Sequence, residues 1–233
     1  SILEFLAAKL KQFPGVDEKL FAILSNYPSQ LTTVIVTLDP ETMGGRKVAE
    51  RVALLSKIGY EDPYRAVTNN KGIMNGVDAV LIATGNDYRA IESATAVLAN
   101  QDGHYRSLSK WTMQDGKLVG ELTLPMAIGV VGGSIKARKD VQQSFAILGK
   151  KITSAKLAEI IVSVGLANNL AALLAISTVG IQAGHMKLQA RNIVAELDAS
   201  DDEKKQVLTQ IIEQKDYSES YAQLVLKQIR EGK

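Results

Sequence analysis

The longest apolar segment of the chain, residues 155–177, constrains the fold more than any other feature. Its length and composition predict a helix that is buried on nearly all sides, so other elements must pack around it. No stretch of the chain approaches the roughly 18 or more uncharged apolar residues of a membrane-spanning helix, and no signal peptide is visible. We therefore expect this segment to lie in a protein core and not in a membrane.

Three other segments have the composition of β-strands. Residues 31–38 are rich in β-branched side chains, and residues 118–124 alternate between apolar and polar side chains. A shorter apolar run at residues 20–24 also has strand character. These segments can form the walls of a sheet on which the long apolar helix packs.

Several segments before the second strand show helical periodicity. Residues 2–13 and 47–58 each place apolar side chains on one face. A further helix can start at Pro63, because proline suits the first helical turn. Gly72 and Gly76 then bracket a predicted break in that helix.

Residues 77–98 keep helical spacing throughout, and we interpret them as one long, buried central helix. Gly85 lies inside this segment and would cost about 1 kcal/mol relative to alanine. A helix that tolerates this cost suggests close approach by a ligand or by another backbone.

The C-terminal part is helical throughout, with a helix predicted at residues 180–195 after a possible hinge at its first glycine. Ser200 with Glu203 forms a capping box, and Asp216 with Glu219 repeats the pattern before the last apolar stripe. The sequence therefore predicts an α+β fold. A large domain is built round a long central helix with sheet walls, and a small all-helical flap follows it.

The composition of the 233 residues excludes several classes of function. The formal net charge of +2 argues against a nucleic-acid partner, which needs a clustered basic surface. The absence of cysteine excludes disulfides and a cysteine nucleophile and fits a cytoplasmic protein. Only two histidines occur, at positions 104 and 185, so we expect no metal site.

Polar side chains are dense between residues 62 and 75. Arg65 can hold a carboxylate with two hydrogen bonds, and Lys71 can stabilise a developing oxyanion. Such a set suits an anionic ligand that carries a carbonyl group, with Asn75 as a further donor. A solvated loop with helix caps explains the same residues equally simply.

Asp87 and His185 are the other candidates for chemistry. A carboxylate in an apolar helix needs a cationic partner. Lys71, just before that helix, is the nearest candidate in sequence, although pairing with Arg89 or Arg65 for structure alone stays open. His185 can act as a general acid, but a lone helical histidine is often structural or exposed. The glycines at 129–133 form neither a dinucleotide fingerprint nor a phosphate-binding loop.

Taken in order, these segments resemble class II 3-hydroxy-3-methylglutaryl-CoA reductases. The resemblance rests on DPYRAVTNNKGIMNGVDAVLIATGNDYRAIES, GHYRSL, LVGELTLPMAIGVVGG, AEIIVSVGLANNLAAL and GIQAGHMKLQARN, and it runs through essentially the whole chain. Two positions depart from the family pattern, since Asn70 stands where histidine is usual and Tyr88 where tryptophan is usual.

The resemblance implies a role for each candidate residue. Lys71 would stabilise the thioester-derived oxyanion, Asp87 would tune that lysine, and His185, on the flap, would protonate the departing CoA thiolate. The implied substrate-binding residues are Arg65 for the free carboxylate, Asn75 near the carbonyl, and Asn26.

The resemblance also implies a reaction and its partners. HMG-CoA would be reduced to mevalonate and CoA by two molecules of NADPH or NADH, without a metal. The site would form between two subunits, so a homodimer or higher oligomer is expected.

The resemblance divides the chain into three parts. Residues 1–26 would be the tail of the small cofactor-binding domain, 27–179 part of the large catalytic domain, and 180–233 the flap. The family's catalytic glutamate and its cofactor motif would lie before Ser1, so we expect this chain to need the missing N-terminal segment for activity. The alternatives are a non-catalytic CoA-ester-binding or interface fragment and an unrelated helical ligand-binding protein.

Overall fold

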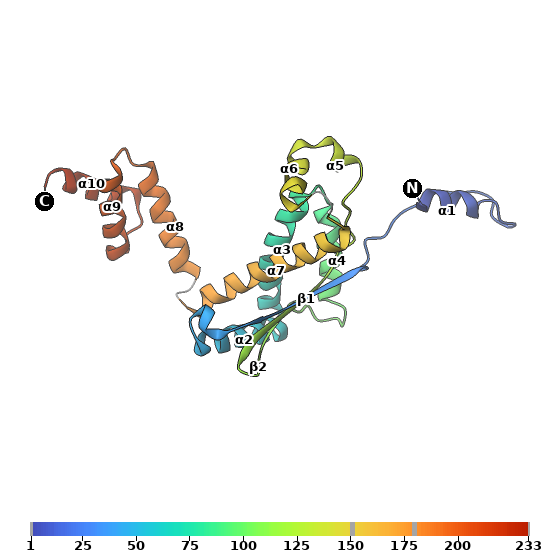
Figure 1. The fold of residues 1–233 in the computed structure, drawn as a ribbon, viewed down its shortest axis with the longest axis horizontal. Helices are drawn as coiled ribbons and strands as arrows, with labels where there is room; N and C mark the ends of the chain where they lie inside the picture. Colours follow the sequence, from blue (N-terminus) through green and yellow to red (C-terminus); the bar gives the residue numbers. More distant parts are fainter. Residues whose placement is uncertain (1, 150–151, 179–180, 233) are drawn as a thin grey trace.

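The computed structural model describes residues 2–149, 152–178 and 181–232. Helices dominate it, and three strands form one small sheet (Figure 1). In chain order the elements are α1 (Ile2–Leu10), β1 (Leu31–Leu38), the 3-10 helix η1 (Pro40–Met43), α2 (Arg46–Glu61), α3 (Pro63–Ala83), α4 (Tyr88–Ala99), β2 (Ser109–Gln114), β3 (Lys117–Pro125), α5 (Gly133–Ala137), α6 (Lys139–Leu148), α7 (Ser154–Ser177), α8 (Ile181–Glu196), α9 (Asp201–Gln214) and α10 (Glu219–Arg230).

The sheet has the order β1-β3-β2, and both neighbouring pairs are antiparallel. Asp115 and Gly116 connect β2 to β3 with φ angles of 47° and 77°, the left-handed pair that a tight hairpin turn requires. One side of β1 is partly buried in the core, whereas Ile35 on its other side is 66% exposed. The predicted strands at 31–38 and 118–124 are thus confirmed, and β2 was not predicted.

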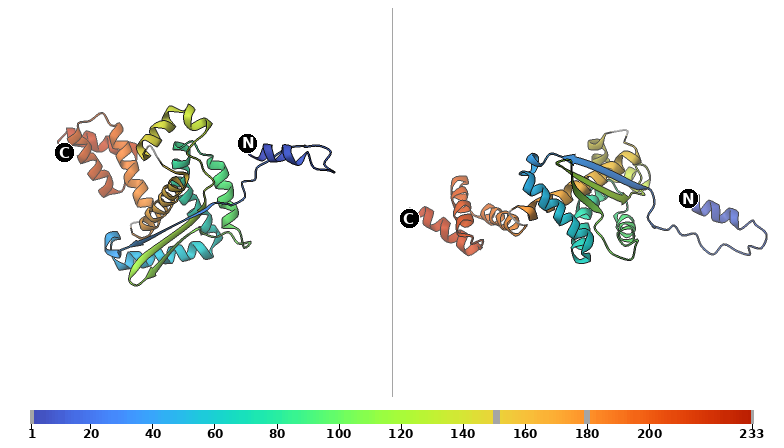
Figure 2. Two further views of the ribbon diagram at one scale, coloured as in Figure 1. Left: turned by 45° about the vertical axis from the view of Figure 1, so that its right-hand side comes forward. Right: turned by 90° about the horizontal axis from the view of Figure 1, so that it is seen from below.

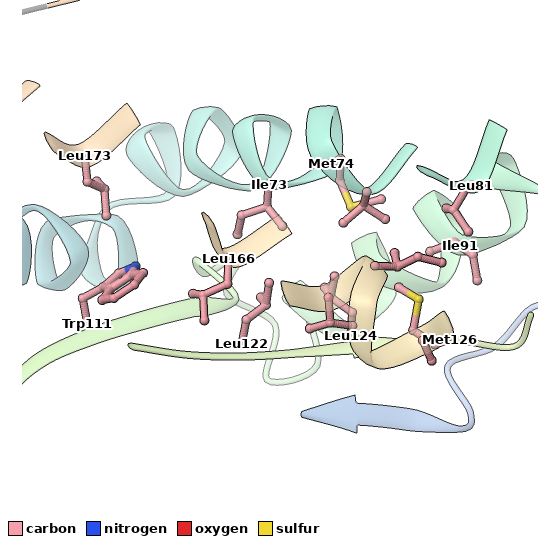
Figure 3. Packing of buried hydrophobic residues seen from close by; sticks show 14 of the residues in the cluster. Ile73, Met74, Leu81, Ile91, Trp111, Leu122, Leu124, Met126, Leu166 and Leu173 are labelled. Carbon is pink, nitrogen blue, oxygen red and sulfur yellow. The ribbon is translucent and has the colours of Figure 1, made fainter. Parts of the chain in front are cut away.

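The hydrophobic core lies between the sheet and helices α2, α3, α4 and α7. In Figure 3, Leu166 of α7 lies between Ile73 of α3 and Leu122 of β3, and all three side chains are at most 3% exposed. Trp111 of β2 closes one end of this core against Leu173. The segment at 155–177 therefore forms a core helix, as its composition indicated.

Glycines allow α3 and α7 to pack closely, which explains why the predicted break at Gly72 and Gly76 is wrong. Helix α3 runs through both residues. A Cβ atom on Gly76 would lie 3.2 Å from the Val164 carbonyl oxygen, and one on Gly165 would lie 2.8 Å from Val77 Cγ2. Gly76 thus serves the contact between α3 and α7 and does not end α3.

The single helix predicted at residues 77–98 is also wrong, because the chain breaks between α3 and α4. Helix α3 ends at Ala83, Gly85 follows with φ 68°, and Asp87 caps α4 by accepting hydrogen bonds from the backbone of Arg89 and Ala90. Apolar periodicity continues across the break because both helices face the same core. Gly85 therefore follows the end of α3 and is not an interior helix residue, because glycine readily adopts the left-handed conformation found at helix ends.

Two segments extend away from this body. Residues 11–30 carry no regular structure, so the strand predicted at 20–24 is wrong. The helix predicted at 2–13 forms as α1, but it ends at Leu10. In both views of Figure 2, α1 lies on one side of the body and α8–α10 on the other. Helix α1 buries no residue, so neither of its faces is packed.

Helices α8, α9 and α10 share a hydrophobic cluster of their own, which includes Val194, Val207 and Val225. The predicted capping box is confirmed, because Ser200 accepts from the Glu203 backbone and Glu203 accepts from that of Ser200. The second predicted box is wrong: Ser218 caps α10, while Asp216 accepts from its backbone and hydroxyl. The domain limits at 26 and 179 stay predictions.

Helix α7 meets the length and composition criteria for crossing a membrane, contrary to the expectation that no stretch approaches them. The reason is that residues 160–177 carry no charged side chain, and their many apolar residues outweigh the two asparagines among them. Asn169 is 1% exposed and bonds to Trp111 and Asn69 inside the core. These contacts identify α7 as the central helix of the packed body.

Candidate functional site

A pocket of about 310 Å³ opens between α3 and α4, and it contains the predicted lysine. Its lining residues come from α3, from α4 and from the segment that follows α4: Val67, Asn70, Lys71, Met74, Asn75, Asp78, Glu92, Thr95, Ala96 and Tyr105. A larger cavity of about 560 Å³ lies between α2 and β2, but it contains none of the predicted site residues. The α3–α4 pocket is therefore the candidate site.

Helix α3 holds Lys71 because its first turn is fixed by local sequence. Asp62 accepts a hydrogen bond from the backbone of Tyr64 at 3.0 Å, and Pro63 occupies the first turn. Lys71, Met74, Asn75 and Asp78 then follow at helical spacing on the face that lines the pocket.

A buried amide network fixes the opposite face of α3. The Asn69 side chain donates to the Ser109 hydroxyl at 3.0 Å and accepts from Asn169 of α7 at 2.9 Å. The Trp111 indole N–H donates to the Asn169 carbonyl oxygen at 2.8 Å. The helix that carries Lys71 is thus hydrogen-bonded to both the sheet and α7.

Asn70 joins the pocket to the segment that precedes β2. Its side-chain amide donates to the Arg106 carbonyl oxygen at 2.8 Å and accepts from the Leu108 backbone at 3.0 Å. Asn70 is 2% exposed, so both of its polar groups are satisfied inside the protein. It therefore holds the wall of the pocket.

Asp87 lies away from the pocket. Its carboxylate accepts from the backbone of Arg89 at 3.1 Å and of Ala90 at 3.3 Å, and the Arg89 guanidinium lies 3.5 Å from it. The adjacent Asn86 backbone bonds to the carbonyl oxygen of Leu81. Asp87 thus sits beside the last turn of α3 and does not line the pocket that contains Lys71.

The other predicted residues are spread over the chain. Asn75 lines the pocket, whereas Arg65 is half-buried near Gly59 of α2 and lies outside the lining. Partial burial lowers the pKa of the Arg65 guanidinium, which stays charged at neutral pH. Asn26 is exposed in the extended N-terminal segment, and the side chain of His185 lies outside the described residues.

Two carboxyl groups in the pocket were missed at the sequence level. Asp78 of α3 and Glu92 of α4 both line it, and Glu92 lies within hydrogen-bond reach of Asp78. Burial, followed by the hydrogen bond and charge of Glu92, raises the pKa of Asp78 from 3.8 to about 7. The signal was the spacing of Lys71, Asn75 and Asp78, which places all three on one helix face.

A family model described as hydroxymethylglutaryl-coenzyme A reductase matches residues 1–190, which include Lys71, Asp87 and His185. The chain belongs to the hydroxymethylglutaryl-coenzyme A reductase family. The class II resemblance seen in the sequence is thereby confirmed.

Curated members of the family match over nearly the whole chain. The chain is 40% identical to the 3-hydroxy-3-methylglutaryl-coenzyme A reductase of Archaeoglobus fulgidus, over 89% of its own length and 48% of the relative's. It is 36% identical to the probable reductase of Borreliella burgdorferi, over 99% and 56% respectively. The chain therefore spans about half the length of the curated relatives it matches.

Solved structures of family members have the same fold. The 3-hydroxy-3-methylglutaryl-coenzyme A reductase of Streptococcus pneumoniae is 42% identical, with a TM-score of 0.71 over 98% of this chain and 56% of that one. A second structure, of the class II reductase from this organism bound to NADPH in open conformations, is also 42% identical with a TM-score of 0.70 over 98% and 57%. The α+β fold class predicted for this reductase family member is confirmed.

Proposed function

We propose that this chain supplies the lysine-bearing part of a hydroxymethylglutaryl-CoA reductase site, at which HMG-CoA is reduced to mevalonate and CoA. The observation that carries the proposal is Lys71, which lines a polar pocket on a helix whose other face is fixed by buried hydrogen bonds. The family match adds the reaction.

Lys71 has the chemistry that thioester reduction requires. Hydride addition to the thioester carbonyl places negative charge on its oxygen, and the ammonium group of Lys71 can stabilise that charge. Asn75, one turn further along α3, can donate a hydrogen bond to the same carbonyl group. Arg65 is the proposed partner of the substrate's free carboxylate, and Asn26 is a further proposed substrate ligand.

NADPH is the proposed hydride source, because the pneumococcal relative binds it, and NADH is the alternative. The α3–α4 pocket, at about 310 Å³, is at the lower limit for ligand sites and does not fit a dinucleotide in addition to a thioester. We therefore place the dinucleotide on residues other than those that line this pocket. No metal is included in the proposal, and we place the protein in the cytoplasm.

Lys71 and Asp87 of the same chain are too far apart to meet. Lys71 and Leu81 are ten residues apart on α3, which separates them by about 15 Å along the helix axis. Asp87 lies beside Leu81, and the four-carbon stem of a lysine is too short to cross that distance. We propose that Lys71 of one copy approaches Asp87 of a second copy, in a homodimer or higher oligomer.

His185 is the proposed acid for the CoA thiolate, since imidazole can donate a proton near neutral pH. It belongs to α8, at the start of the helical cluster formed by α8, α9 and α10. Movement of this cluster as a flap would exclude water during the reaction and release products afterwards.

The runner-up is a non-catalytic part that binds a CoA ester or only forms an interface. What favours it is the single-chain position of Asp87, whose carboxylate caps α4 and lies beside Arg89. In that case Asp87 has a structural role and Lys71 has no acidic partner from a second copy.

Replacement of the lysine separates these two proposals. In the catalytically competent protein that contains this chain, we expect Lys71→Ala to lower kcat about 10³-fold, the order of a lost oxyanion donor. Lys110→Ala, an exposed residue of β2, is the matched control and should leave kcat unchanged. Turnover by Lys71→Ala within about threefold of the wild type would favour the non-catalytic role.

A further inference from the structure

The contact between α3 and α4 contains two carboxyl groups and few hydrogen-bond donors. Asp78 Oδ1 is inaccessible to solvent and has no hydrogen-bond partner among the described residues, although Asp78 as a whole is partly exposed. Thr95 Oγ1 is also inaccessible to solvent and without a hydrogen-bond partner among the described residues, and Thr95 is 3% exposed. Both residues are among those that line the α3–α4 pocket.

Glu92 is the neighbour that can satisfy Asp78. Two ionised carboxylates cannot hydrogen-bond to each other, because neither has a proton to donate. Once one of them is protonated, its O–H donates to the other, and the unpartnered oxygen gains a strong hydrogen bond. The raised pKa of Asp78 agrees with this arrangement.

The other titratable groups of the pocket do not provide this donor. Lys71 of α3 and Tyr105 of the segment after α4 line the pocket, but neither shares a hydrogen bond or ion pair with Asp78 among the described residues. No titratable side chain from α2, α6 or α7 is part of the described lining. The Thr95 hydroxyl does not provide it either, because Thr95 Oγ1 has no hydrogen-bond partner among the described residues. A proton between the two carboxyl groups is the donor that remains.

We propose that Asp78 and Glu92 share one proton across the contact between α3 and α4, and that this proton holds α4, with Asp87 at its start, against the helix that carries Lys71. The two helices are joined by the short turn at residues 84–87, in which Gly85 has a φ angle of 68°. Asp78 and Glu92 are therefore positioning residues. Their importance for catalysis rests on the proposed function, whereas the shared proton does not.

Carboxyl carbon NMR of the ¹³C-labelled chain tests the shared proton directly. We expect the Asp78 side chain to titrate near pH 7, and Glu92→Gln to lower that midpoint by at least about one pH unit, because the second negative charge is removed. Asp115→Asn, in the hairpin turn, is the matched control and should leave the midpoint unchanged. A wild-type Asp78 midpoint below pH 5 would overturn the proposal.

Amide hydrogen exchange tests whether the proton holds α4. Asp78→Asn keeps a donor at every pH, so its α4 amides should be equally protected at pH 6 and pH 8.5 after correction for intrinsic rates. In the wild type we expect protection of α4 to fall about tenfold over the same range. Equal protection of wild type and variant at pH 8.5 would overturn the positioning role.

Both measurements are independent of turnover. If Lys71→Ala retains activity while Asp78 titrates near pH 7 and α4 loosens, the proposed function fails and the shared proton stands. Glu92→Gln serves as the second variant if Asp78→Asn does not fold, because residue 92 is exposed and tolerates substitution more easily. In that variant the fall in α4 protection should likewise disappear.

Discussion

Replacement of Asn169 by leucine should destabilise the frame that holds Lys71, which is the buried hydrogen-bond network that fixes helix α3. Asn169 is 1% exposed, accepts from the Trp111 indole at 2.8 Å and donates to Asn69 at 2.9 Å. Leucine has nearly the same volume but leaves an indole N–H and an amide oxygen buried without partners. Each such group costs about 1–3 kcal/mol.

Part of this loss is offset, because the leucine side chain gains about 1–2 kcal/mol from burial. The net expectation is a loss of about 2–4 kcal/mol, a large share of the 5–15 kcal/mol typical of a folded protein. Urea unfolding followed by fluorescence measures it well, since Trp111 is the single tryptophan of the chain and lies in the network itself.

The control for this prediction is Ser163→Ala, an exposed position on the same helix. We expect that substitution to change the free energy of unfolding by less than about 0.5 kcal/mol. If Asn169→Leu costs no more than Ser163→Ala, the buried amides do not stabilise the frame and the reasoning is refuted.

Three further outcomes follow from the same structure. Gly165→Ala places a Cβ atom 2.8 Å from Val77 Cγ2, so overpacking should cost about 1–3 kcal/mol in urea unfolding; a neutral substitution would show that α3 and α7 are not in close contact. The raised pKa of Asp78 means that the folded state holds its proton more tightly than the unfolded state, so the stability it contributes is present below pH 3.8 and is lost as pH rises to about 7. Between pH 5 and pH 8, the free energy of unfolding of Asp78→Asn should therefore rise by about 1–2 kcal/mol relative to that of the wild type, a value reduced for solvent screening. If the two proteins show parallel dependences of stability on pH, this prediction is contradicted. His185→Gln should lower thioester reduction far more than mevaldehyde reduction, because only the former releases a thiolate; equal losses would count against the proposed acid.

Periodicity predicted the core helix and two of the three strands of the sheet, β1 and β3, well. Residues 155–177 and 31–38 needed no tertiary information, because a long apolar run and a β-branched run each have one stable environment. Strand β2 was missed because its polar side chains, such as Lys110, outnumber the apolar ones, and Trp111 is its only buried apolar residue. Its pairing with β3 decides its structure.

Glycines explain most of the other errors. Gly76 was interpreted as a break and Gly85 as a helix residue, whereas the structure reverses both roles. Conformational preference alone cannot distinguish them, because the close approach of α7 to Gly76 is a tertiary contact. The strand predicted at 20–24 failed for a related reason, since no neighbouring strand pairs with it.

The site was only partly predictable. Lys71 and Asn75 share a pocket because one helix turn separates them, which sequence spacing reveals. The expected meeting of Lys71 with Asp87 placed Lys71 just before the helix that contains Asp87, whereas α3 continues through Lys71 to Ala83 and separates the two residues within one chain. The turn at Gly85 brings Glu92 of α4 close to Asp78 of α3, and the spacing of residues in the sequence did not reveal this turn.

Mixed oligomers provide the most direct measurement of whether Lys71 and Asp87 form one site across two copies. The catalytically competent protein carrying Lys71→Ala and the same protein carrying Asp87→Asn should each be inactive alone. After co-expression or subunit exchange, random pairing gives dimers in which one site contains both wild-type residues, so about a quarter of the wild-type activity should return. Recovery to that level is the result we predict, and a mixture as inactive as its two components would contradict it.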